Sequence, residues 1–224
     1  MKASLRLCLT GGESATFLCG EPVAKLQTTT SVGVSIKATG SSPFSKVPLA
    51  NCAACPCNQS PLVNPPIKLG KKILLVGEAP GEVEEQRGEF FVGPTGELLN
   101  ERILPFSGVK RNDLAITNVL LCRPARKLAP GEWKQAIACC APRLANDVRN
   151  AKPKLIIAAG KRSLHALSGR AQITALTGAP INGWRLTAKE KEDGSIDLKE
   201  SGKADTVTAD FTKYTILPIM HPAW

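Results

Sequence analysis

The chain has few aromatic residues and no long apolar segment. Its 224 residues include six Phe, three Trp and one Tyr, only 4% of the composition, so an aromatic side chain in a loop is a candidate for a specific role. No apolar run approaches the roughly 18 residues that a membrane-spanning helix requires. Residues 1–20 show neither a continuous apolar core nor a clear cleavage site, which argues against a signal peptide. We therefore expect a cytoplasmic protein without membrane contact.

Acidic residues are scarce relative to basic ones. The 29 Lys and Arg residues exceed the 19 Asp and Glu residues by ten, and the pI is near 9.3. Such a charge suits a polyanionic partner such as DNA or RNA, although a basic surface also occurs without one. The basic residues are dispersed, which predicts a cationic face rather than a basic tail; they include Lys71, Lys72, Lys110, Arg111, Arg123, Arg126, Lys127, Arg143, Arg149, Lys161 and Arg162.

Apolar strand-like runs alternate with helical patterns from about residue 51 onwards. This alternation predicts an α/β fold of three layers, α/β/α, around a mostly parallel four-stranded sheet. We expect residues 1–50, which contain Gly/Ser/Thr-rich stretches, to form a partly flexible extension, and residues 51–224 to form the domain. Residues 186–210 are charged and predict a surface excursion or hairpin. The predicted strands are 72–77, 114–119, 154–160 and 214–220, and the predicted helices are 95–104, 130–150 and one starting at 163.

Polar residues follow several of these predicted strands. In open α/β sheets, ligands bind beyond the carboxyl ends of the strands. Here those ends carry Glu78, Asn118, Gly160 and His221. The sequence therefore predicts a cleft at this edge of the sheet.

Cysteine is unusually frequent, with eight residues. Cys52 and Cys55 form a CxxC pair, and Cys122 and Cys140 follow at a distance. Four thiolates in this arrangement could bind zinc or a [4Fe–4S] cluster, and spacing alone favours zinc. Buried or free thiols are the alternative. Cys57 and Cys139 stand beside the candidate ligands and leave the assignment open, while Cys8 and Cys19 have no partner at ligand spacing.

Several motifs together resemble one known family. The stretch VGEAPGEVEEQRGEFFVGPTGELL, residues 76–99, is similar to the first motif of the family-4 uracil-DNA glycosylases. The family's CxxCP, TNV..CRP, CxPxL and HPS/HPA motifs have counterparts, in the same order, at residues 52–56, 117–124, 140–144 and 221–223. The resemblance covers residues 52–224 and implies a uracil-DNA glycosylase-like fold. It also implies that Cys52, Cys55, Cys122 and Cys140 hold a [4Fe–4S] cluster rather than zinc.

The resemblance further implies the function of the predicted cleft. The substrate would be uracil in single- or double-stranded DNA, flipped out of the helix and hydrolysed at its glycosidic bond to leave an abasic site. Phe91 would stack on the base, with Phe90 as the alternative. Asn118 would pair with the uracil edge, and His221 would stabilise negative charge at uracil O2.

The first motif supplies the remaining candidates for the site. Carboxylates of Glu78 and Glu84 would stabilise the cationic sugar or position water. Backbone groups of Ala79, Pro80 and Gly81 would contact the base or a phosphate. The side chains expected to contact DNA phosphates are those of Arg123, Arg126 and Lys127.

One departure from the family pattern keeps other functions open. The chain ends at Trp224, where family members continue with a DNA-intercalating loop and a helix, so we expect weaker base flipping. The alternatives are a weakly active or inactive DNA-binding module of the same fold associated with replication proteins, a glycosylase for another damaged base, and a zinc-stapled RNA-binding protein. For the glycosylase we expect a monomer in a bacterial, archaeal or phage-infected cell, with replication or repair proteins as further partners.

Overall fold

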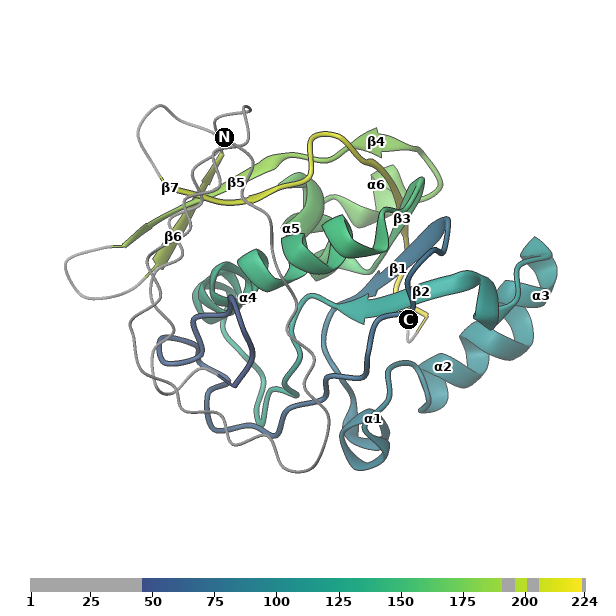
Figure 1. Ribbon diagram of the computed structural model, residues 1–224, viewed down its shortest axis with the longest axis horizontal. Coiled ribbons are helices and arrows are strands. Elements are labelled where there is room, and N and C mark those ends of the chain that lie inside the picture. The colour runs from purple at the N-terminus through teal and green to yellow at the C-terminus, as the bar shows by residue number, and fades with distance from the viewer. Residues whose placement is uncertain (1–45, 191–195, 201–205, 223–224) are drawn as a thin grey trace, which may run out of the picture. The chain divides into compact units, whose positions relative to one another are not determined.

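The computed structural model describes residues 46–190, 196–200 and 206–222 (Figure 1). All of them belong to one structural unit, Ile36–Trp224. Most of the predicted extension, including Cys8 and Cys19, lies outside the described residues. Val47 and Ala50 are buried beside Cys52, so the last residues before the predicted boundary pack into the domain core. The boundary at residue 50 stays a prediction.

A five-stranded sheet forms the centre of the domain, in the order β2-β1-β3-β8-β4 (Figure 1). Its first four strands are mutually parallel, and each is a short, mostly apolar run with at least two buried residues. These four confirm the predicted strands. Their bounds are Ile73–Gly77 for β1, Leu114–Asn118 for β2, Leu155–Ala159 for β3 and Thr215–Ile219 for β8.

The predicted strand count was too low by one. The additional strand β4, Ile181–Asn182, pairs antiparallel with β8 at the sheet edge. Two residues carry no measurable alternation of apolar and polar side chains, so this strand has no signal in the sequence.

Side chains on the two faces of the sheet enter separate cores, which confirms the three-layer fold. Leu74 and Val76 of β1 pack against α4 and α5, whereas Leu75 faces Leu99 and Leu104 on the other side. Strand side chains alternate in direction, so one apolar strand serves both cores. The helices of the first core are α4, Pro130–Ala151, and α5, Lys161–Ser168, followed by the short α6, Ile173–Leu176.

The helical segment on the second face is divided into pieces. After α1, Glu82–Arg87, the chain forms α2, Pro94–Leu98, a π-helical turn over Leu99–Ile103, and α3, Leu104–Ser107. The prediction of one helix over 95–104 therefore located the helical segment but missed its division and its last turn. A 3-10 turn over Arg111–Asp113 then leads into β2.

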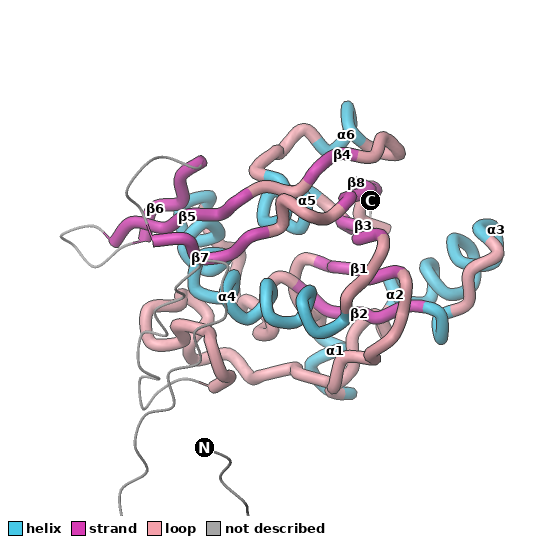
Figure 2. The backbone as a smooth tube through the Cα atoms, turned by 45° about the horizontal axis from the view of Figure 1, so that its top comes forward, coloured by secondary structure: helices cyan, strands magenta, loops and turns pink. Residues whose placement is uncertain are grey.

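The predicted surface excursion forms a second, antiparallel sheet in the order β6-β5-β7. It packs against α4 (Figure 2), and Leu186, Ala209 and Phe211 join the core on that side. The described strands are β5, Arg185–Glu190, β6, Ile196–Glu200, and β7, Thr206–Asp210. Within the described part of the chain, none of the helices is both long and apolar enough to span a bilayer.

Candidate functional site

The carboxyl ends of four parallel strands meet at one edge of the central sheet. Gly77 at the end of β1 is in register with Asn118 at the end of β2. On the other side, the Gly160 N–H after β3 donates to the carbonyl of Ile219 at the end of β8, at 2.9 Å. The predicted site residues that follow these strands therefore lie along a single edge, as expected for a cleft.

Gly77 is the floor of one part of this site. Asn118 and Phe91 are 2% and 5% exposed, and both side chains lie over the Gly77 Cα. A Cβ on Gly77 would overlap the Asn118 Oδ1 and lie 2.7 Å from the Phe91 Cζ. The absence of a side chain at Gly77 is therefore what lets an amide and an aromatic ring share this position.

The backbone of Phe91 takes a conformation that is unfavourable for its residue type. Its φ is 53°, in the left-handed region that costs a non-glycine residue about 1–2 kcal/mol. Arg111 holds it there: one guanidinium nitrogen donates to the Phe91 carbonyl at 3.1 Å and the other to the Phe90 carbonyl at 2.6 Å. Phe90 lines a different cavity, with Arg111 and Leu114. The structure thus brings Phe91, not Phe90, to Asn118.

Glu84 is buried and engaged with the same loop. Its Oε1 accepts hydrogen bonds from the backbone N–H groups of Val92 at 3.0 Å and Gly93 at 2.9 Å. A Cβ on Gly81 would lie 2.5 Å from the other carboxylate oxygen. This carboxylate therefore joins the start of α1 to the segment that follows Phe91.

Glu78 and His221 meet at the second part of the site, over Gly160. A Cβ on Gly160 would lie 3.0 Å from the Glu78 carboxyl carbon and 3.1 Å from the His221 Cδ2, and the φ of Gly160, +99°, also favours glycine. The Arg162 backbone N–H at the start of α5 donates to the Glu78 Oε1 at 2.9 Å, which fixes the carboxylate. Burial lowers the pKa of His221 below its usual value, while the charge of Glu78 acts in the opposite direction.

The segment between these two parts is anchored by its backbone. The Leu120 N–H donates to the Glu78 carbonyl at 3.0 Å, and the Gly81 carbonyl accepts from Glu85 in the first turn of α1. Pro80 is buried and Ala79 is partly buried against the core. Gly81 is exposed and precedes α1, so it is accessible to a ligand.

Six cysteines line a single cavity, together with Leu120 from the segment after β2. The four predicted ligands, Cys52, Cys55, Cys122 and Cys140, share it with the two neighbouring residues of open assignment, Cys57 and Cys139. All six are free thiols. Across the described residues, no three His, Cys, Asp or Glu side chains are grouped closely enough to share one metal ion.

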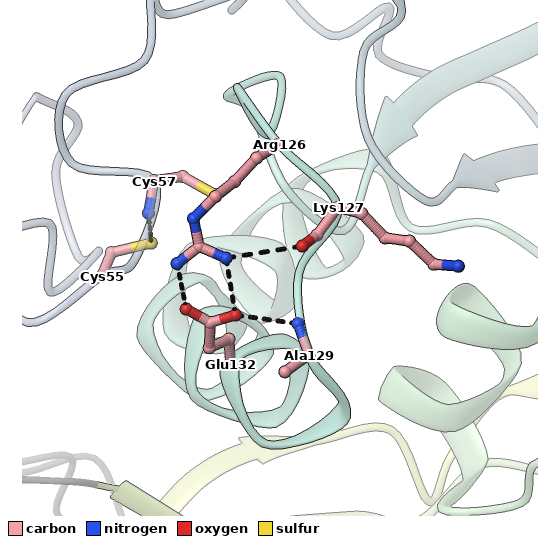
Figure 3. Close-up of polar contacts among 6 residues, drawn as sticks. All are labelled: Cys55, Cys57, Arg126, Lys127, Ala129 and Glu132. Atoms are coloured by element: carbon pink, nitrogen blue, oxygen red, sulfur yellow. Dashed lines mark hydrogen bonds and ion pairs between the residues drawn. The ribbon is translucent and has the colours of Figure 1, made fainter.

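The thiols of this cavity influence one another. Hydrogen bonds from Cys139 and then Cys57 lower the pKa of Cys55, and the Cys57 backbone N–H also donates to the Cys55 Sγ at 3.4 Å (Figure 3). Burial raises the pKa of Cys140 to about 12 and also raises that of Cys122. The donor set is sulfur throughout, which suits soft metal centres such as iron–sulfur clusters and zinc.

Two of the predicted phosphate-contacting arginines are engaged with carboxylates. Arg126 forms a two-point ion pair with Glu132, which also accepts the Ala129 N–H at the start of α4 (Figure 3). Arg123 contacts Glu82 and Glu85 of α1 at 3.3 and 3.2 Å. Exposed pairs of this kind contribute little stability, so a phosphate could displace the carboxylates.

One basic residue assigned to the cationic face from sequence is in the interior. Arg143 on α4 is 5% exposed, and its guanidinium donates to the carbonyls of Asn118 and Val119. Together with Arg111, it is a contributor to the site that sequence reasoning missed. Its helical position supplied a signal, because residues three apart lie on the same side of a helix and Arg143 is three residues after the predicted ligand Cys140.

Comparison with known proteins connects the chain to one group. A sequence model described as the uracil DNA glycosylase superfamily matches residues 67–224. The chain is 38% identical over 123 residues to the type-4 uracil-DNA glycosylase of Pyrobaculum aerophilum, an alignment that covers 53% of this chain and 60% of the relative. For the enzymes of the same name from Thermotoga maritima and Sulfurisphaera tokodaii, identity is 36% over 135 residues and 40% over 92 residues.

These alignments differ in extent. The Thermotoga alignment covers 58% of this chain and 69% of the relative, and the Sulfurisphaera alignment covers 41% of each. The chain thus spans about two fifths to about two thirds of the length of these curated relatives.

Proposed function

The chain belongs to the uracil-DNA glycosylase superfamily and to its type-4 group, and from this membership and the geometry of the site we propose that it hydrolyses the N-glycosidic bond of uracil in DNA. The observation that carries the proposal is the meeting of Phe91 with Asn118 over Gly77, and of Glu78 with His221 over Gly160, along one sheet edge. The first group suits recognition of a base, and the second suits the charges that form as its bond breaks.

Base recognition would fall to Phe91 and Asn118. A uracil flipped out of the DNA would stack on the Phe91 ring, which is worth about 1–3 kcal/mol per base. The Asn118 amide offers one acceptor and two donors, which match the N3–H and O4 of uracil. Cytosine presents an amino donor where uracil has O4, so an amide held in one orientation rejects it.

Bond cleavage would fall to His221 and Glu78. Departure of the base leaves negative charge on uracil and positive charge on the sugar. A His221 imidazole N–H would stabilise the charge at uracil O2, as oxyanion-hole donors do. Glu78, already fixed by the Arg162 N–H, would stabilise the sugar cation or position the attacking water.

The rest of the first motif would support this pocket. We assign Glu84 the role of holding the Phe91 loop through Val92 and Gly93. Its carboxylate would also stabilise the cationic sugar or position water. The backbone at Ala79, Pro80 and Gly81, of which Gly81 is the exposed residue, would contact the base or the adjacent phosphate.

A [4Fe–4S] cluster is the group we propose for the cysteine cavity. Cys52, Cys55, Cys122 and Cys140 would each bind one iron, so these ligands need not share a single ion. The cluster would contribute a structural link rather than redox chemistry. Its ligands would join the loops that carry Cys55 and Cys122 to α4, which carries Cys140.

DNA is the proposed partner, in single- or double-stranded form. The net charge of +10 favours it, because phosphate contacts provide most of the sequence-independent affinity. We further propose action as a monomer in the cytoplasm, where thiols stay reduced. Replication or repair proteins as additional partners stay a prediction.

The direct test uses a 5′-labelled single-stranded oligonucleotide with one uracil. Anaerobically purified protein should create an abasic site there, so that hot alkali cleaves the strand at that position. The same oligonucleotide with thymine in place of uracil should stay intact. An uncleaved uracil strand, in the presence of folded protein that carries its cluster, would leave the DNA-binding module as the better account.

Replacement of Gly77 by Ala tests the shared position of Asn118 and Phe91. The new Cβ would displace both side chains, and a shift of about 1 Å in a reacting site can cost about 100-fold in rate. We expect single-turnover uracil release to slow by about this factor. Gly131→Ala is the matched control, because a Cβ there meets nothing within 4 Å. Equal rates for Gly77→Ala and Gly131→Ala would show that Gly77 is not the floor of the pocket.

A further inference from the structure

A buried arginine of α4 contacts the end of strand β2. The Arg143 guanidinium donates to the carbonyls of Asn118 at 2.8 Å and Val119 at 2.6 Å. It also donates to the Thr117 Oγ1 at 3.1 Å and to the Asp147 Oδ2 at 2.7 Å. Burying a guanidinium is costly unless it is paired. Here one arginine joins α4 to three consecutive residues, the last two of β2 and the residue after it.

The same strand segment is held from its other side by β1. The Val119 N–H donates to the Gly77 carbonyl at 2.9 Å, and the Leu120 N–H donates to the Glu78 carbonyl. The backbone at Asn118 and Val119 is therefore clamped between β1 and Arg143. Because Asn118 is 2% exposed and lies over Gly77, a small movement of this backbone would move its amide out of position.

Arg143 also links the site at the sheet edge with the cysteine cavity. Cys139 and Cys140 precede it by about one turn on α4, and Cys122 follows Val119 closely in the chain. Both ends of the clamp are thus attached to segments that line the cysteine cavity.

We propose that Arg143 is a positioning residue that sets the orientation of Asn118 and thereby the recognition of the base. This inference rests on the proposed function of Asn118. Arg143 does not touch the base itself. Asp147 and Thr117 hold the guanidinium, which transmits the position of α4 to the Asn118 backbone.

The test compares Arg143→Lys with Arg149→Lys, an exposed position on the same helix. Lysine keeps the charge but cannot donate to several acceptors in one plane. Amide hydrogen exchange at Val119 and Leu120 should become faster in Arg143→Lys and stay unchanged in Arg149→Lys. Asp147→Asn is a milder change that should also make exchange at Val119 and Leu120 faster. It provides a second test if the Arg143→Lys variant fails to fold.

Kinetics then separate positioning from general stability. With a uracil oligonucleotide, Arg143→Lys should lower kcat/KM about 10- to 100-fold, the effect of losing a charged hydrogen bond. In an Asn118→Ala background, the same substitution should have almost no further effect, because its target is gone. A merely structural role would instead give the same loss in both backgrounds.

The outcomes distinguish this inference from the proposed function. Unchanged exchange at Val119 and Leu120, or independent losses from Arg143→Lys and Asn118→Ala in an active enzyme, would overturn the clamp. Faster exchange combined with no uracil release by the unsubstituted chain would support the clamp but overturn its link to base recognition and the proposed function.

Discussion

Replacing His221 by alanine is expected to slow uracil release about 100- to 1000-fold, the loss typical of removing one oxyanion donor. The imidazole lies beside Glu78 at the end of β8, where charge on the departing base would develop. Single-turnover rates on a uracil oligonucleotide measure this step directly. His221→Gln, which retains a donor, should keep more activity than His221→Ala.

The other histidine provides a matched control. His165 on α5 contacts the Gly169 carbonyl at 3.3 Å and packs near Trp184. His165→Asn retains a donor at this place and should leave the rate of uracil release unchanged. A rate for His221→Ala within a few fold of the His165→Asn rate would remove His221 from the proposed chemistry.

Replacing Cys140 by serine is expected to abolish cluster binding and to lower the melting temperature. A link between distant loops is worth about 4 kcal/mol by loop-closure entropy. For a chain of this size, that corresponds to a loss of about 8–16 °C. Iron and sulfide content, visible absorbance and thermal unfolding measure the two effects.

The adjacent Cys139 makes this experiment specific. Both residues line the cavity, but only Cys140 belongs to the proposed ligand set. Cys139→Ser should retain four iron atoms per chain, and Cys57→Ser should do the same. The opposite result, with iron lost in Cys139→Ser and retained in Cys140→Ser, would reassign the fourth ligand.

The parallel strands of the sheet could be predicted because they are apolar runs bounded by turn residues. The three-layer fold followed from their alternation with helices and is confirmed by the two separate cores. The hairpin of β5 and β6 agrees with the predicted excursion or hairpin. Strand order, the two-residue β4 and the pairing of β5 with β7 depend on contacts between residues that are far apart in the chain, for which a single sequence carries no signal.

The candidate site was predictable where a motif marked it. The motifs predict four site residues, and the structure brings them to one edge in two groups, Phe91 with Asn118 and Glu78 with His221. Their roles stay predictions. The supporting interactions were not visible, because the left-handed backbone of Phe91 and its contact with Arg111 arise only from packing.

Arg143 shows how composition can mislead. The dispersed basic residues, with Arg143 among them, predict a cationic face, whereas Arg143 lies on the buried side of α4. The packing of Glu84 is likewise not evident from the sequence, since its carboxylate accepts hydrogen bonds from two backbone N–H groups beyond its own helix. A charged side chain in a motif therefore also positions a loop.

The most direct test of the central claim is to identify what the protein releases from uracil-containing DNA. Chromatography with mass detection separates free uracil from deoxyuridine monophosphate. The proposed glycosylase predicts free uracil in a quantity equal to the abasic sites formed, with no cytosine or thymine released from matched strands. Release of the nucleotide instead of the base, or of no product at all by folded, cluster-containing protein, would contradict the account.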